Sequence, residues 1–276
     1  MIPPIARNFL AGETPAEAIA HAETLSERNV GAILNLLGEH YSDRTAAAGD
    51  ASAYCQLIED VAASDARACI SVKPTQLGLD ISEDCFRTNL DAVLETATEH
   101  GTFVWIDMED YTTTAATVAA FEENAPVHDV GVCLQSNMKR TDDDLERLAN
   151  LPGKVRLVKG AYDPPNAVSY GKKEHVEEAI RRHLRYMFEQ FDDGVALGSH
   201  DPELITIAAD LHATSGTPYE IQMLMGVRTQ AQYELAAHHD VWQYVPYGRK
   251  WPSYFYRRLL ERTGNVTFAL RAISPF

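Results

Sequence analysis

The stretch VRLVKGAY, Val155 to Tyr162, combines the pattern of a buried strand with two positive charges. Five of its eight residues are apolar, in a pattern typical of a buried strand. Two cations, Arg156 and Lys159, interrupt it. An unpaired charge in a protein core costs on the order of several kcal/mol, and the neighbouring sequence contains no run of acidic residues. We therefore expect both cations to have anionic partners that the local sequence does not supply.

Runs of the same apolar kind recur along the chain, and helix-period segments lie between them. Parallel strands need helical crossovers, and eight of them close into a barrel of roughly 250 residues. The chain of 276 residues therefore predicts one domain over residues 1–276. The predicted fold is α/β, a TIM-type (β/α)8 barrel with a short N-terminal helix at Pro15 to Glu27. The runs are Val30 to Glu39, Cys69 to Thr75, Phe103 to Asp110, Val130 to Asn137, Val155 to Tyr162, Val195 to His200, Tyr219 to Gly226 and Val241 to Gly248.

The segments between the runs carry helix signals. Ser82 to Gly101 is amphipathic, with Ser82 as the expected N-cap and Gly101 as the expected C-cap. Lys173 to Phe191 is charged on one face and apolar on the other. Both patterns predict helices that cover a sheet.

Composition limits the possible partners and compartments. The net charge of −16 argues against a nucleic-acid partner and against docking on an anionic membrane. Four scattered cysteines, with no CxxC pair, fit a reducing compartment. The N-terminus lacks a signal-peptide pattern, and no apolar run reaches transmembrane length. These features predict a cytoplasmic protein, and the acidic surface is also consistent with a high-salt cytoplasm.

Nearly every run has a polar residue near its carboxyl end, where the active sites of such barrels lie. A single residue of this kind is equally well explained as a solvated strand end. The recurrence across the runs favours a site. The residues are Glu39, Lys73, Asp107 with Glu109, Gln135, Arg156 with Lys159, His200, Gln222 and Tyr244.

The last unit adds adjacent arginines, Arg257 and Arg258, after the aromatic cluster of Trp251 and residues 254–256. Guanidinium groups bind carboxylates through paired hydrogen bonds, at about 1.5 to 3 kcal/mol for each charged bond. An amphipathic helix with exposed arginines would explain the same pattern. If the helix lies over the barrel mouth, the arginines and aromatic rings form a pocket for a small amino acid.

These segments resemble the proline dehydrogenase family. The resemblance rests on VRLVKGAY, LGSHD, YEIQMLMG, and YVPYG followed by YFYRRLLER, with DMED and VCLQSN in the expected order. It runs from about residue 31 to 265, and the length resembles the stand-alone form of the family. The resemblance implies FAD-dependent oxidation of L-proline to 1-pyrroline-5-carboxylate, with electrons passed to a quinone-type acceptor and a transient, peripheral contact with the inner face of the membrane.

The family's cofactor site implies roles for several residues of this chain. Arg156 is expected near the flavin N5 and O4, with Lys159 among the polar contacts and Gln135 bonded to the ring. The remaining residues assigned to the FAD site are Ala161, Ser199, His200 and Gln222.

The family's substrate site is carried over in the same way. Arg257, Arg258 and Lys73 are expected around the proline carboxylate, and Asp107 is expected to support them. Glu39 is expected to pair with Arg257 in the empty site. The residues expected to line the proline ring are Tyr162, Tyr244, Tyr254 and Leu224.

Other functions remain open at this stage. A Schiff-base lyase of the aldolase type would use Lys159 or Lys73 as the amine. A hydroxyproline dehydrogenase would prefer a smaller residue at Tyr254, because a ring hydroxyl needs space. A non-catalytic amino-acid sensor could use the same scaffold. No HxH or HExxH motif indicates a metal hydrolase, and no metal site is predicted.

Overall fold

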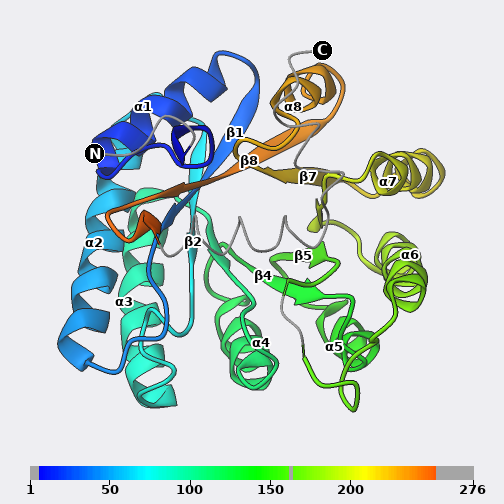
Figure 1. Ribbon diagram of the computed structural model, residues 1–276, viewed down its shortest axis with the longest axis horizontal. Helices are drawn as coiled ribbons and strands as arrows, with labels where there is room; N and C mark the ends of the chain where they lie inside the picture. Colours follow the sequence, from blue (N-terminus) through cyan, green and yellow to red (C-terminus); the bar gives the residue numbers. More distant parts are fainter. Residues whose placement is uncertain (1–5, 162–163, 253–276) are drawn as a thin grey trace.

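The structure is a computed structural model that describes residues 6–161 and 164–252. Within these ranges, parallel strands close into a barrel in the order β1 to β8, and β8 pairs with β1. Figure 1 shows the helices on the outside, around the ring of strands. The predicted barrel is therefore confirmed. The strands are β1 Val30–Leu36, β2 Ala68–Val72, β3 Val104–Ile106, β4 Val130–Gln135, β5 Lys154–Val158, β6 Val195–Gly198, β7 Tyr219–Leu224 and β8 Asp240–Tyr247.

The helices follow the capping signals of the sequence. Ser82 accepts a hydrogen bond from the backbone N–H of Cys85 at 3.1 Å, and Gly101 ends the same helix with φ at 65°. The helix predicted from Pro15 ends at Ser26. The helices are η1 Ala6–Asn8, α1 Pro15–Ser26, α2 Arg44–Ala62, α3 Glu83–His100, α4 Thr114–Asn124, α5 Thr141–Leu148, α6 Lys173–Gln190, α7 Pro202–Ser215 and α8 Thr229–Leu235.

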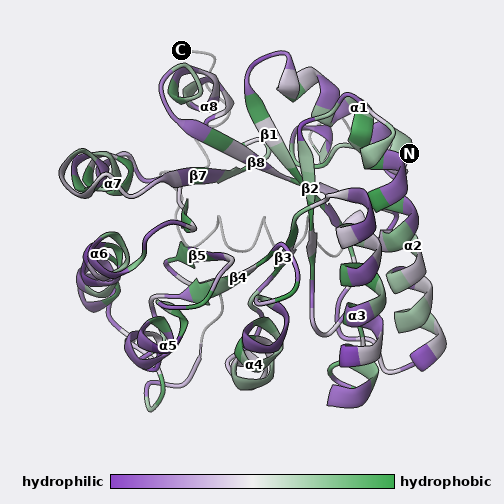
Figure 2. Ribbon diagram, turned by 180° about the vertical axis from the view of Figure 1, so that it is seen from behind, coloured by the Kyte–Doolittle hydropathy of each residue, from purple (hydrophilic) through white to green (hydrophobic). Residues whose placement is uncertain are grey.

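Buried apolar side chains of the described residues form two main clusters, and a small third one contains Ala6 and Leu10. The larger cluster lies between the strands and the helices, and Figure 2 shows hydrophobic strands inside helices of mixed character. The smaller cluster lies inside the barrel and is centred on Trp105, with Ile33, Cys69 and Ala196 around it. Both faces of each strand are thus covered, as the nearly continuous hydrophobic runs indicate.

Gly131 provides the space for Trp105 inside the barrel. A Cβ atom at Gly131 would lie 2.6 Å from Cζ3 of Trp105 and 2.9 Å from the backbone oxygen of Lys154. We expect Gly131→Ala to lower the free energy of unfolding by about 1 to 3 kcal/mol, because neither neighbour can retreat in a packed barrel. Chemical denaturation measures the change.

The matched control is Gly49→Ala on α2, where an added Cβ meets nothing within 4 Å. It should raise stability by up to about 1 kcal/mol, since alanine favours the helix. Equal stability of the Gly131 variant and the unmodified protein would contradict the packing argument.

The strands are shorter than the predicted runs at their carboxyl ends. Lys73, Asp107 and Lys159 all follow the last residue of their strands. Gln135 ends β4, while Arg156, Gln222 and Tyr244 lie within strands. The polar residues therefore occupy the mouth and the upper interior of the barrel.

Candidate active site

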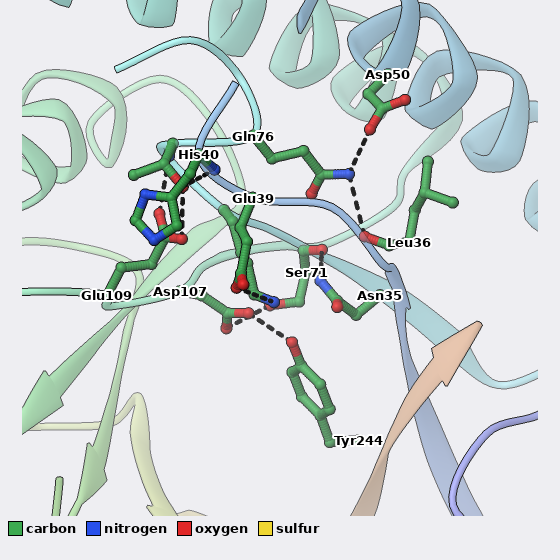
Figure 3. Close-up of polar contacts among 12 residues, drawn as sticks. Asn35, Leu36, Glu39, His40, Asp50, Ser71, Gln76, Asp107, Glu109 and Tyr244 are labelled. Atoms are coloured by element: carbon green, nitrogen blue, oxygen red, sulfur yellow. Dashed lines mark hydrogen bonds and ion pairs between the residues drawn. The ribbon is translucent and has the colours of Figure 1, made fainter. Parts of the chain in front are cut away.

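Asp107 is the centre of the polar groups inside the barrel. It follows β3, is 7% exposed, and accepts hydrogen bonds from Ser71 Oγ and Tyr244 Oη, each at 2.6 Å. The Arg156 guanidinium forms an ion pair with the same carboxylate. Figure 3 shows Ser71 of β2 and Tyr244 of β8 directed at Asp107. Three donors of the described residues therefore converge on this carboxylate.

Arg156 is held by further contacts from other strands. It is 5% exposed, and its Nη1 donates to Oε1 of Gln222 at 3.0 Å. Its guanidinium carbon lies 4.9 Å from the centroid of the Trp105 ring and 5.7 Å from that of Tyr244. The anion that the sequence required for Arg156 is therefore Asp107, and the aromatic rings add cation–π contacts.

Tyr244 remains a hydrogen-bond donor at neutral pH. Burial, followed by the negative charge of Asp107, raises the pKa of its hydroxyl well above the usual value of 10. The hydroxyl therefore keeps its proton and donates a hydrogen bond to Asp107. Tyr244 positions the Asp107 carboxylate as well as closing one side of the interior.

Lys73 and Glu39 lie beside this centre, after β2 and β1. Lys73 Nζ lies 3.8 Å from Glu39 Oε2, and the two side chains are 13% and 19% exposed. The sequence predicts a pair between Glu39 and Arg257, and Arg257 lies outside the described residues. Lys73 is thus a largely buried cation near the mouth, placed to attract a carboxylate.

Glu109 supports the loops around the mouth, a role that the sequence did not indicate. It is 1% exposed and accepts from the backbone N–H of Thr75 at 2.8 Å and from its hydroxyl at 2.7 Å. The backbone oxygen of Glu109 accepts from Gln135 Nε2 at 2.7 Å. One residue therefore links the loop after β2 with the end of β4.

Glu109 should make stability depend on pH. Its pKa is raised above 4.5, mainly by burial, although bonds from Thr75 and the charge of Lys73 oppose the shift. A raised pKa favours the protonated folded state, so this contribution is complete below the unfolded value and is lost as the pH rises through the folded value. The unfolding free energy of the unmodified protein minus that of Glu109→Gln should therefore decrease from pH 4.5 upward. Urea denaturation of both proteins at several pH values measures this difference in unfolding free energy. A difference that stays constant or increases with pH would contradict the role of Glu109.

The opposite side of the mouth contains residues assigned to the cofactor. Gln135 Oε1 accepts from the backbone N–H of Ala161 at 3.3 Å, and Lys159 Nζ lies 2.9 Å from Asp201 Oδ2. Burial raises the pKa of Asp201, but hydrogen bonds from Lys159 and from the start of α7 outweigh it, so the pKa is lowered. Lys159, the second cation of the stretch Val155 to Tyr162, is therefore also paired, and its partner is Asp201 at the barrel mouth.

Ser199 and His200 help to build the loop after β6. Ser199 Oγ accepts from the backbone N–H of Asp201 at 3.1 Å, and His200 Nε2 accepts from that of Leu224 at 3.3 Å. The backbone oxygen of His200 accepts from Arg228 at 2.6 Å. These contacts connect the ends of β6 and β7, and Leu224 ends β7 at the same place.

Four of the predicted substrate residues fall outside the described part of the chain. They are Tyr162, Tyr254, Arg257 and Arg258. The described residues bring Asp107, Arg156, Gln222 and Tyr244 into one connected group. Lys73 forms an ion pair with Glu39.

Ser71 and Glu220 also belong to the polar interior, although neither was predicted from the sequence. Ser71 stands two residues before Lys73, and Glu220 two residues before Gln222. Residues two apart on a strand face the same side, so the alternation within each run was a usable signal. The groups of His, Cys, Asp and Glu in the described ranges include none suited to a metal ion.

Comparison with known proteins identifies the family. The family model described as proline dehydrogenase matches residues 18–271. The chain belongs to the proline dehydrogenase family. Membership in the proline dehydrogenase family confirms the resemblance found in the sequence, and with it the prediction of a proline-oxidising enzyme of proline catabolism.

Two relatives of the proline dehydrogenase family match almost the whole chain. Proline dehydrogenase 1 of Bacillus subtilis is 32% identical over 277 residues, which cover 97% of this chain and 90% of the relative. Proline dehydrogenase of Deinococcus radiodurans is 32% identical over 280 residues, with 98% and 90% covered.

Solved structures of proline utilization A (PutA) share the fold. The crystal structure of PutA from Bdellovibrio bacteriovorus inactivated by N-propargylglycine has a TM-score of 0.85 at 23% identity, over 95% of this chain. PutA from Corynebacterium freiburgense has a TM-score of 0.79 at 22% identity, over 97%. This chain spans about a third of each PutA chain. In the described residues, no helix is long and apolar enough to span a bilayer.

Proposed function

We propose that this enzyme oxidises L-proline to 1-pyrroline-5-carboxylate at the barrel mouth with FAD as its cofactor. The observation that carries the proposal is the buried Arg156, held by Asp107 and Gln222 in the barrel of a proline dehydrogenase family member. The Arg156 guanidinium is held in place by residues far from it in the sequence, and such a fixed positive charge stabilises negative charge that develops beside it during a reaction.

The residues at the mouth fit a flavin cofactor. Arg156, Lys159 and Gln135 offer hydrogen-bond donors of the kinds that a ring with carbonyl oxygens and a diphosphate require. Asn137 Oδ1 is buried without a hydrogen-bond partner among the described residues, beside the backbone of Gly160. FAD, when bound, would supply the two-electron acceptor, and Arg156 would stabilise the negative charge that its ring gains.

Lys73 has the properties of a substrate carboxylate ligand. Its side chain is only 13% exposed, and its ammonium group lies near the mouth, 3.8 Å from Glu39. In this proposal the proline carboxylate binds this ammonium group. Arg257 and Arg258 complete the carboxylate site in this proposal, and Leu224, Tyr162, Tyr244 and Tyr254 enclose the ring.

The other residues of the proposed site either hold the Arg156 charge in place or exclude water. Tyr244 and Asp107 hold Arg156, while the apolar ring contacts exclude water from the reacting carbon. Proline reacts with its amine neutral, and the protein supplies no nucleophile. The Lys159 amine donates to Asp201 at 2.9 Å and is directed at an anion rather than at a substrate carbonyl, which disfavours the Schiff-base lyase. A quinone is proposed as the final electron acceptor, reached by transient contact with the membrane.

Absorption spectroscopy of the purified protein, with and without L-proline under anaerobic conditions, tests the proposal. A flavin band that bleaches on addition of proline is the expected result. Re-oxidation by a soluble quinone analogue would support the proposed acceptor. A flavin band unchanged by proline would overturn the substrate, and a protein that stays colourless after incubation with FAD would overturn the cofactor.

A further inference from the structure

A second ion pair lies inside the barrel next to the active-site group. Lys154 stands two residues before Arg156 on β5, and its Nζ lies 2.5 Å from Oε2 of Glu220 on β7. Glu220 is 4% exposed. Burial of a carboxylate at this depth is costly unless it is paired and hydrogen-bonded. The contacts of Glu220 therefore show whether its carboxylate only neutralises the charge of Lys154 or also positions active-site residues.

Gln222 connects this ion pair to Arg156. Its Nε2 donates to Glu220 Oε1 at 2.6 Å, and its Oε1 accepts from Arg156 Nη1 at 3.0 Å. Arg156 in turn pairs with Asp107. A continuous chain of hydrogen bonds thus runs through the barrel from Lys154 to the mouth.

The carboxylate of Glu220 determines which way the Gln222 amide faces. A carboxylate only accepts, and a guanidinium only donates. The observed orientation satisfies both, with the amide nitrogen toward Glu220 and the amide oxygen toward Arg156. The reverse orientation would place two donors together at Arg156 and two acceptors together at Glu220.

We propose that Glu220 is a positioning residue for the reaction. Its carboxylate orients the Gln222 amide, and that amide holds the Arg156 guanidinium against Asp107. A neutral amide side chain at position 220 would accept either orientation of Gln222, so Arg156 alone would favour the observed one and the restraint on Arg156 would be weakened. The inference rests on the proposed function only for the role of Arg156 toward the flavin.

The test is a pair of single variants and their combination. Glu220→Gln removes the orienting charge, and Gln222→Glu places two carboxylates side by side. Combining both changes exchanges the two groups and restores the pattern. The new carboxylate at position 222 accepts from Arg156 and from the new amide at position 220, and the oxygen of that amide accepts from Lys154. We expect each single variant to lower the thermal midpoint of the FAD-free protein by about 5 °C, and the combined variant to recover most of the loss.

The combined variant separates this role from simple pairing with Lys154. If Glu220 serves only as the anion for Lys154, the combined variant is no more stable than Glu220→Gln, because position 220 still lacks that charge. A combined variant no more stable than Glu220→Gln, or one that does not fold, would overturn the proposal, since all its donors, acceptors and net charge are conserved.

Flavin measurements on the loaded enzyme provide the second readout. Glu220→Gln should shift the flavin reduction potential to a more negative value and lower kcat/KM for proline by roughly tenfold to 100-fold, because Arg156 is displaced. The matched control is Glu122→Gln, which removes an equally short contact, 2.5 Å to Arg147, outside the barrel, and should change neither. An unchanged potential in Glu220→Gln would count against the positioning role. A wild-type protein that binds no FAD would overturn the proposed function, while the stability comparison would still decide the role of Glu220.

Discussion

Asp107→Ala is expected to lower the free energy of unfolding by about 3 to 5 kcal/mol, the largest effect on stability that we predict. The substitution leaves Arg156, which is 5% exposed, without its ion-pair partner. Ser71 and Tyr244 lose the acceptor of their 2.6 Å hydrogen bonds at the same time. Denaturant unfolding of the FAD-free protein measures the loss.

Two further variants make this result specific. Asp84→Asn removes a carboxylate that lies 4.0 Å from Arg44 and is 87% exposed, and it should lower stability by no more than about 1 kcal/mol, since the side chain lies in the first turn of α3. Asp107→Ala combined with Arg156→Met should be more stable than Asp107→Ala alone, because the unpaired buried charge is gone. A combined variant less stable than the single one would show that the ion pair does not explain the loss.

Arg156→Met should reduce the rate of flavin reduction by proline about 100-fold to 1,000-fold, the largest effect on activity that we predict. Methionine fills similar space inside the barrel but carries no charge to stabilise the developing anion. Its effect on folding should be smaller than that of Asp107→Ala, since Asp107 keeps its two hydroxyl donors. Anaerobic stopped-flow absorbance measures the rate.

The control for Arg156 is a surface arginine. Arg147→Met removes contacts to Glu122 and Asp144 on the outside of the barrel, where the Arg147 side chain is 49% exposed. Its rate of flavin reduction should equal that of the unmodified enzyme. A rate for Arg156→Met within about threefold of the unmodified enzyme would remove Arg156 from the mechanism, because a fixed charge at the reacting centre is worth far more than that.

The fold could be predicted because its signals are local. Each run is largely apolar, which indicates a covered parallel strand, and the caps at Ser82 and Gly101 depend on residues within one turn of the helix. The barrel topology then brings the carboxyl ends of all strands to one mouth, which is why polar residues late in the runs were good candidates for the site.

The partners of the candidate residues could not be predicted, because they depend on side-chain direction across the barrel. Asp107 and Glu109 are two positions apart, yet Asp107 binds Arg156 while Glu109 binds Thr75. Asp107 and Arg156 are 49 positions apart, a separation that the sequence gives no reason to choose over any other.

The sequence by itself determined the barrel, the family and the need for an anion opposite Arg156, whereas Lys159 lies after β5 with its side chain 35% exposed. Only the tertiary structure decided that the partners of these cations are Asp107 and Asp201, and that Glu220 contacts Arg156 through Gln222. The physical reason is that apolar periodicity and helix caps act between near neighbours, whereas the partner of a buried charge is set by strand register and barrel closure, which join residues far apart in the chain.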